Sequence, residues 1–152
     1  VTNMKISLFV SVFIITVFMG CSNSNVSTDH VDKNDLQLTG KYFKLIELMG
    51  KPVKMSENQQ KETHIIFKEE ESRVNGFGSC NTFFGSFEIK AGNRISFSNI
   101  TSTLKACPDM EIETEFFKIL ELTLNYNFDG KYLQLNREKM ATLAKFEVIW
   151  FE

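Results

Sequence analysis

The sequence predicts an α+β fold that is mainly antiparallel β-sheet with one helix packed against it. From about residue 41 onwards, short apolar segments alternate with turn residues. Two pairs of segments are separated by the tight-turn sequences Ala91-Gly92-Asn93 and Asp129-Gly130, which are typical of hairpins. One stretch, 108–123, instead has apolar residues at helical spacing. Strands, short turns and one helix together predict a strongly curved sheet whose open side the helix covers.

The first expected strand covers residues 41–49 and ends at Gly50. Alternation predicts Phe43 and Leu45 on one face and Tyr42, Ile46 and Leu48 on the other. The remaining strands are expected at 63–68, 73–77, 83–90, 94–99, 125–128, 131–136 and 142–151, the last contributing Leu143, Phe146, Val148 and Trp150.

The expected helix runs from Pro108 to about Thr123, because proline suits a first helical turn. Its buried stripe is predicted to comprise Ile112, Phe116, Ile119, Leu120 and Thr123. Acidic residues are concentrated in the early turns, where they favour the helix dipole.

Composition excludes one class of function and raises one question. The chain has 152 residues and a formal net charge of −2, and no basic patch stands out, so nucleic acid is not an expected partner. Its 15 phenylalanines predict either a phenylalanine-rich core or an apolar cleft.

The N-terminal residues have the features of an export signal. Lys5 precedes an uncharged apolar run at 6–19, which is short for a membrane span. The tetrad Phe18-Met19-Gly20-Cys21 resembles a lipobox, in which the cysteine is lipidated after cleavage. We therefore expect a lipoprotein signal peptide at 1–20 and lipidation of Cys21. The alternative is an ordinary signal peptide cut near Gly20, which would leave Cys21 as an unpaired thiol.

Residues 21–35 are rich in Ser, Asn, Asp and Thr and hold few apolar side chains. Such a segment buries too little surface to offset its ordering entropy, which predicts a flexible tether. The domain is then expected at 36–152. The protein is expected in the cell envelope, held to the membrane by its lipid; Ser22 is compatible with the outer membrane, facing the periplasm or the cell surface.

Two motifs carry the chain's remaining cysteines. They are Asn75-Gly76-Phe77-Gly78-Ser79-Cys80-Asn81-Thr82-Phe83-Phe84-Gly85 and Thr103-Leu104-Lys105-Ala106-Cys107-Pro108-Asp109-Met110. Together they resemble the paired motifs of the META-domain family, whose members are often described as HslJ-like after a heat-shock protein. The residues that carry the resemblance are Gly76, Gly78, Asn81, Gly85, Thr103, Pro108, Met110, Glu113 and Phe116.

The chain differs from the family pattern at three positions. Phe43 takes the place of a usual tryptophan, Ser79 that of a frequent glycine, and Leu104 that of a common basic residue. The resemblance implies a half-open antiparallel barrel of about seven or eight strands with one flanking helix. It implies no cofactor, and we expect a monomer.

Cys80 and Cys107 allow three interpretations. In an exported protein, two thiols in separate motifs indicate a disulfide. Buried thiols that fill space in the core are the alternative. A metal site would need further ligands, and His64 is the nearest candidate by type, so no metal is expected.

The motif glycines do not form a phosphate-binding loop, since no helix and no Lys-Ser/Thr pair follow them. They are interpreted as bulges or kinks that let the sheet curl. Asn81 is predicted to bond backbone groups beside Cys80 or near the Thr103 strand.

No catalytic arrangement is evident. His30 lies in the expected tether, and His64 is expected on the solvent side of a strand. Glu111, Glu113 and Glu115 point in different directions from one helix, so they form no acid/base pair. Glu113 lies near the apolar stripe and is predicted to accept hydrogen bonds from a strand backbone.

Two non-enzymatic functions remain. The first is an envelope lipoprotein that acts in stress response or maintenance through a protein partner. The second is a carrier or pilot module that holds an acyl chain or apolar peptide in the half-open barrel, which would require a cavity of at least about 300 Å³.

Overall fold

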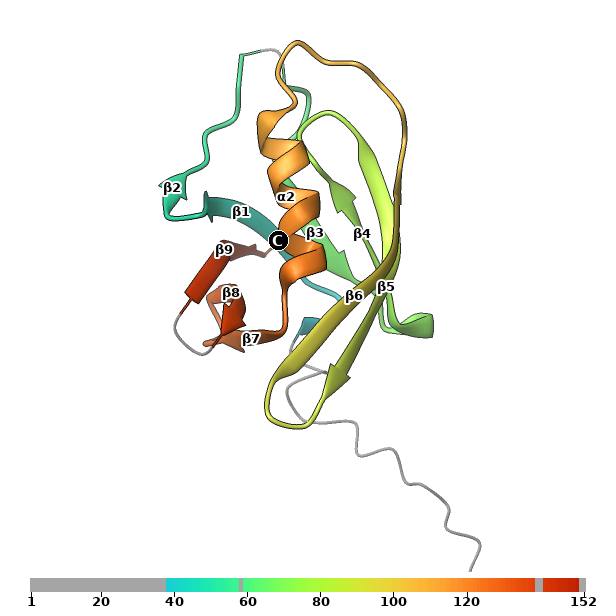
Figure 1. The fold of residues 1–152 in the computed structure, drawn as a ribbon, viewed down its shortest axis with the longest axis vertical. Helices are drawn as coiled ribbons and strands as arrows, with labels where there is room; N and C mark the ends of the chain where they lie inside the picture. The colour runs from blue at the N-terminus through green and yellow to red at the C-terminus, as the bar shows by residue number, and fades with distance from the viewer. Residues whose placement is uncertain (1–37, 58, 139–140, 151–152) are drawn as a thin grey trace, which may run out of the picture.

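A computed structural model describes residues 38–57, 59–138 and 141–150 (Figure 1). The expected signal peptide at 1–20, the lipidated Cys21, the tether at 21–35, His30 and the end of the last strand at Phe151 lie outside the described residues.

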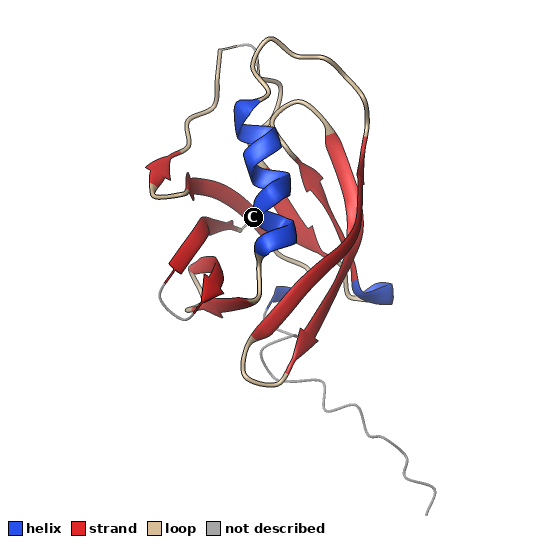
Figure 2. Cartoon of the chain, viewed as in Figure 1, coloured by secondary structure: helices blue, strands red, loops and turns tan. Residues whose placement is uncertain are grey.

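The described residues form one antiparallel sheet that closes on itself (Figure 2). Its strands are β1 (Tyr42–Leu48), β2 (Lys51–Pro52), β3 (His64–Phe67), β4 (Arg73–Phe77), β5 (Thr82–Lys90), β6 (Arg94–Ser102), β7 (Asn125–Phe128), β8 (Tyr132–Glu138) and β9 (Ala141–Ile149). Neighbours pair in the order β2-β1-β3-β4-β5-β6-β7-β8-β9, and β1 also pairs with β9. Eight strands therefore form a closed barrel. The short strand β2 pairs with the end of β1 and is not part of the barrel wall. The predicted fold class is confirmed.

The barrel closes unevenly. β1 and β9 pair along six residue positions, from Tyr42↔Ile149 to Leu48↔Ala144. β6 and β7 are joined by the single pair Arg94↔Asn125, and Ile95 N donates to Leu124 O beside it. The half-open barrel implied by the family resemblance thus corresponds to this weakly paired seam.

The helix α2 (Glu111–Leu122) covers the seam and packs against β6, β1 and β9 (Figure 1). Its buried residues are Glu113, Phe116, Ile119 and Leu120. The helix starts three residues later than predicted, so Pro108 lies in the preceding loop rather than in the first turn. Thr123 caps the C-terminal end, where its Oγ1 donates to Ile119 O at 2.7 Å.

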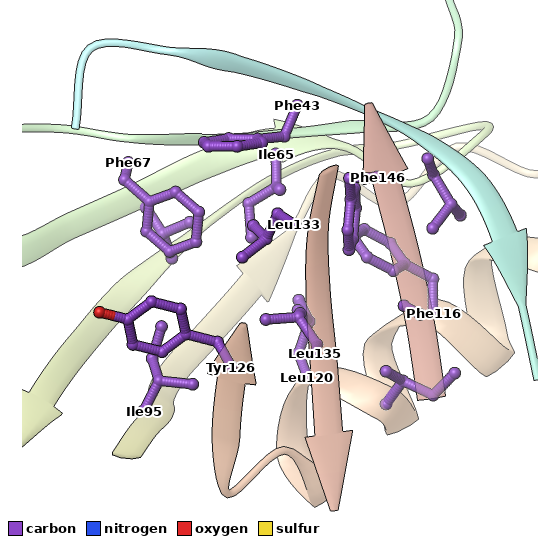
Figure 3. Packing of buried hydrophobic residues seen from close by; sticks show 14 of the residues in the cluster. Phe43, Ile65, Phe67, Ile95, Phe116, Leu120, Tyr126, Leu133, Leu135 and Phe146 are labelled. Atoms are coloured by element: carbon purple, nitrogen blue, oxygen red, sulfur yellow. The ribbon is translucent and has the colours of Figure 1, made fainter. Parts of the chain in front are cut away.

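Aromatic side chains fill the barrel (Figure 3). Phe43 and Phe67 meet edge to face at 5.7 Å between ring centroids, and Phe83 meets Phe116 of the helix at 5.6 Å. Phe116 also lies 6.0 Å from Phe146 of β9. Of the two alternatives that the phenylalanine content predicted, the described barrel shows the phenylalanine-rich core.

Two details of the predicted strands are wrong. Leu48 is buried with Phe43 and Leu45, because a register shift between Leu45 and Glu47 moves it to the inner face. Trp150 does not join the core: it follows the end of β9 and its side chain is 68% exposed. Neither the bulge nor the early end of β9 has a signal in the residue alternation.

Candidate functional site

The two cysteine motifs meet at the end of the barrel where α2 begins. A disulfide joins Cys80, in the turn before β5, to Cys107, in the loop between β6 and α2, with 6.0 Å between their Cα atoms. Of the three interpretations of these cysteines, the structure has the disulfide. It closes the loop that brings residues 103–107 against the turn at 78–81.

Glu113 connects the helix to this turn. Its Oε2 accepts hydrogen bonds from Cys80 N at 3.0 Å and from Asn81 N at 2.7 Å, and its Oε1 accepts one from Asn81 Nδ2 at 2.7 Å. The side chain is buried, with 2% of its surface exposed. Glu113 therefore does bond backbone N–H groups, although they belong to the turn before β5 rather than to a strand.

Asn81 connects the same turn to the loop after β6. Its Oδ1 accepts hydrogen bonds from Thr103 Oγ1 and Lys105 N, both at 2.7 Å. Its Nδ2, besides bonding Glu113, donates to Lys105 O at 3.1 Å. We call Cys80, Asn81, Thr103, Cys107 and Glu113 the polar cluster. It fixes three chain segments that lie far apart in the sequence.

The motif glycines allow close approach of other atoms. A Cβ on Gly78 would lie 2.7 Å from Glu113 Oε2, and one on Gly76 would lie 2.1 Å from His64 O. Only Gly85 lies at an irregularity, the register shift between Phe84 and Ser86. Gly76 pairs in regular register with Ile65 and Phe83, and Gly78 follows the end of β4, so neither of these two glycines lies at a bulge.

Ser79 adopts a backbone conformation that favours glycine. Its φ is 134°, and its buried Oγ has no hydrogen-bond partner among the described residues. The strained position is the one at which the family pattern often has glycine. The remaining motif residues have simpler places: Pro108 is exposed in the loop, Met110 is the N-cap residue of α2 and Phe116 lies in the core.

The arrangement offers little to a chemical reaction. Both carboxylate oxygens of Glu113 already accept internal hydrogen bonds, and the side chain is buried. His64 lies on the outer face of β3, as predicted, and is half-buried there because it stacks between Tyr42 and Phe77, at 4.3 and 6.5 Å between ring centroids. Its Nδ1 lies 2.9 Å from Glu62 O, and no hydrogen bond among the described residues joins it to a hydroxyl or thiol.

Burial dominates the ionisation of this stack. It lowers the pKa of His64, against the opposing effects of the Glu62 carbonyl and carboxylate. Burial, assisted by the charge of Glu62, raises the pKa of Tyr42 to about 12. Both shifts favour the neutral ring, which suits packing better than proton transfer.

Residues 38–57, 59–138 and 141–150 contain neither a group of metal-binding side chains nor a membrane-spanning helix. No group of three His, Cys, Asp or Glu side chains in these ranges could hold a metal ion. None of the helices there has the length and apolar character needed to cross a membrane.

Several grooves lie on the surface of the described residues, among them the following two. One, of about 540 Å³, runs between residues 102–106 and α2, beside the polar cluster. The other, of about 780 Å³, lies beside the acidic turn at 69–71 and Phe84. Sequence reasoning missed the first groove. Its residues Phe117 and Lys118 belong to neither motif, and the one available signal was the apolar Leu104 at a position that is often basic.

Comparison with known proteins identifies the family. The family model described as META domain matches residues 36–148. No curated protein sequence is significantly similar to the chain.

Solved structures share the fold at low sequence identity. An NMR structure of a protein from Burkholderia xenovorans is 19% identical, with a TM-score of 0.59, and the match covers 76% of this chain and 86% of that one. A crystal structure of a DUF4847-family protein from Bacteroides vulgatus is 18% identical, with a TM-score of 0.55, covering 72% and 93%. A further NMR structure is 19% identical, with a TM-score of 0.58 and coverage of 74% and 92%. With the family model matching most of the chain and the closed barrel and paired motifs in place, the chain belongs to the META-domain family.

Proposed function

We propose that this protein is a non-enzymatic lipoprotein of the cell envelope that acts in stress response or maintenance by binding a protein partner. The proposal rests on one observation, the hydrogen bonds that the motif residues Glu113 and Asn81 form. Glu113 and Asn81 direct their side-chain bonds to the turn at 80–81 and the loop at 103–105. Because these side chains are committed to holding the loop, the exposed surface beside the loop is what remains available to a partner.

The envelope location is part of the proposal. The lipobox-like sequence ending at Cys21 would supply the lipid anchor, and residues 21–35 would hold the domain away from the bilayer. Ser22 after the anchored cysteine favours the outer membrane. A single polypeptide closes this barrel, and we propose that it acts as a monomer.

The packing of the barrel weighs against the carrier alternative. Fully buried side chains such as Phe43, Phe67 and Leu133 occupy the interior where an acyl chain would have to lie. The grooves of about 540 and 780 Å³ are lined by residues of the barrel ends and loops, including exposed ones. A partner that meets the surface fits this distribution better than a ligand inside the barrel.

The test combines a deletion strain with two complementing variants. We expect deletion to reduce envelope resistance to heat or hydrophobic drugs, and wild type to restore it. Cys21→Ser should release the protein from the membrane fraction and fail to restore resistance, whereas Ser24→Ala, in the same segment, should behave as wild type. The purified protein should show no turnover of ester, peptide, phosphate or glycoside substrates. Normal resistance in the deletion strain, or turnover abolished by His64→Phe, would contradict the proposal.

A further inference from the structure

The groove between β6 and α2 combines an open strand edge with an exposed apolar side chain, Leu104, on a hydrogen-bonded loop. We call it the β6–α2 groove. One wall is formed by residues 102–106, and the other by one face of the helix and its N-cap residue, including Met110, Thr114, Phe117 and Lys118. Its volume is about 540 Å³.

The C-terminal half of β6 has a strand partner on one side. On that side, Thr103 N donates to Thr82 O, which continues the pairing with β5. Because neighbouring residues in a strand point their backbone groups to opposite edges, the N–H and C=O groups of Ser102 point towards α2. Pairing with β7 stops near Arg94 and Ile95, so no described strand reaches this part of the second edge.

Leu104 stands at the rim of the groove on an immobilised backbone. Its side chain is 98% exposed. The residues on both sides of it are held by Asn81, through Thr103 Oγ1 and through Lys105 N and O. A large apolar side chain on a backbone that is already ordered loses little entropy on binding, so Leu104 is suited to anchor a partner.

Two lysines at the groove are available to an acidic side chain of a partner, although acidic residues of α2 lie near them. Lys105 and Lys118 are exposed and form no ion pair with another described residue. Glu113 also lines the groove, and its carboxylate accepts three internal hydrogen bonds. Glu121, farther along α2, is the other acidic lining residue.

We propose that the β6–α2 groove binds an extended segment of a protein partner, which adds as a strand to the free edge of β6. Its backbone would pair at Ser102, an apolar side chain would pack against Phe117 and Met110, and an acidic side chain would meet Lys105 or Lys118. Strand addition of this kind takes affinity from the backbone and specificity from alternate side chains. This inference rests on the proposed function and names the site through which it acts.

The first test uses a phage-displayed library of random heptapeptides, selected against the full chain purified in detergent. Enriched peptides are expected to be extended, apolar and acidic, and to shift the amide signals of residues 100–106 and the exposed face of α2. Ser102→Pro removes the outward N–H without touching the pairing with β5, so it should keep the melting temperature and weaken binding at least tenfold. Leu104→Ser, at an exposed position, should do the same, and Glu88→Ala, at the far end of β5, should have no effect.

Several results would overturn the inference. They are the absence of enriched peptides, signal shifts elsewhere on the barrel, and unchanged binding by both Ser102→Pro and Leu104→Ser. Shifts of the groove signals by vesicles of phosphatidylethanolamine and phosphatidylglycerol, without peptide, would reassign the groove to the membrane surface.

A second experiment separates this inference from the proposed function. The photoreactive residue benzoylphenylalanine is placed at Leu104 or at Glu88 of the full chain in cells. Protein adducts at Leu104 that map to one extended segment and disappear with Ser102→Pro support the inference. Protein adducts at Glu88 alone would refute the groove while leaving a protein partner in place. A lack of protein adducts at both positions, together with normal envelope resistance on deletion, would refute the proposed function itself.

Discussion

Replacement of Glu113 by glutamine tests whether the polar cluster holds this end of the barrel together. The glutamine Oε1 can still accept the N–H groups of Cys80 and Asn81, which now approach Oε2 at 3.0 and 2.7 Å. Its Nε2 would then face Asn81 Nδ2, which bonds Oε1 at 2.7 Å in the native cluster. Two N–H donors would then face each other with no acceptor between them. Asn81 cannot turn its amide over to relieve this contact, because its Oδ1 accepts from Thr103 and Lys105.

The expected cost follows from these contacts. The bond from Asn81 Nδ2 is lost, and the two bonds from the backbone N–H groups no longer have a charged acceptor. These changes should lower the free energy of unfolding by about 2–3 kcal/mol. Glu113→Ala leaves three buried donors without their acceptor and should cost about 4–5 kcal/mol, a large part of the stability of a domain of this size. Glu111→Gln, exposed in the same helical turn, is the matched control and should cost at most about 0.5 kcal/mol.

Urea unfolding of the oxidised protein measures these differences. The double variant Glu113→Gln with Asn81→Asp restores a donor–acceptor pair between the two side chains and should recover part of the loss. If Glu113→Gln is no more destabilising than Glu111→Gln, the cluster does not hold the turn and the loop. Additive effects in the double variant would also refute a direct bond between positions 81 and 113.

Three further predictions follow from the same region and from the aromatic stack. Ser79→Gly should raise the free energy of unfolding by about 1 kcal/mol in urea, because relief of strain at φ 134° exceeds the added entropy of glycine; a loss of stability would refute that strain. Replacing Cys80 and Cys107 together by alanine should cost about 3.5 kcal/mol, since the bridge closes a loop with a sequence separation of 27; equal urea midpoints would show that it adds nothing. His64 binds protons less readily when folded, because burial lowers its pKa, so stability should fall as the pH drops from 7 towards 5. In the variant His64→Phe, the melting temperature should fall less over this pH range than in wild type. The same pH profile in both proteins would contradict the prediction.

The local structure was largely readable from the sequence. The strands at 73–77 and 125–128 match β4 and β7, because turn residues and alternating apolar residues bound them on both sides. The helix was found from its apolar stripe, but its start was not. Residues 103–107 are held by Asn81 and by the disulfide, so the chain enters the helix only after Asp109, whose Oδ1 accepts from Glu111 N.

The structural features that could not be predicted from the sequence depend on long-range contacts. Glu113 and its partners in the turn are 32 and 33 residues apart, and no local pattern announces such a bond. The chemistry of Glu113 was still inferable, since a carboxylate beside an apolar stripe needs buried donors. The inward position of Leu48 was not, because it depends on a bulge whose cause lies in the pairing of β1 with β9.

The polar cluster and Leu104 have different tasks within one loop. Glu113 bonds the backbone N–H groups at 80–81, Asn81 bonds the Lys105 backbone and the Thr103 hydroxyl, and the disulfide joins Cys107 to Cys80. These links set the position of the loop whatever side chain stands at 104. The Leu104 side chain forms no hydrogen bond with these groups, and it is almost fully exposed. A leucine here, where the family pattern often has a basic residue, therefore alters the surface without altering the frame. On the inferred strand addition to the β6–α2 groove, exchange of this one side chain should change which partner segment the groove accepts. Leu104→Arg should accordingly leave the melting temperature unchanged and shift the peptides selected by the groove towards more acidic sequences, whereas selection of the same peptides would place the determinant of specificity elsewhere.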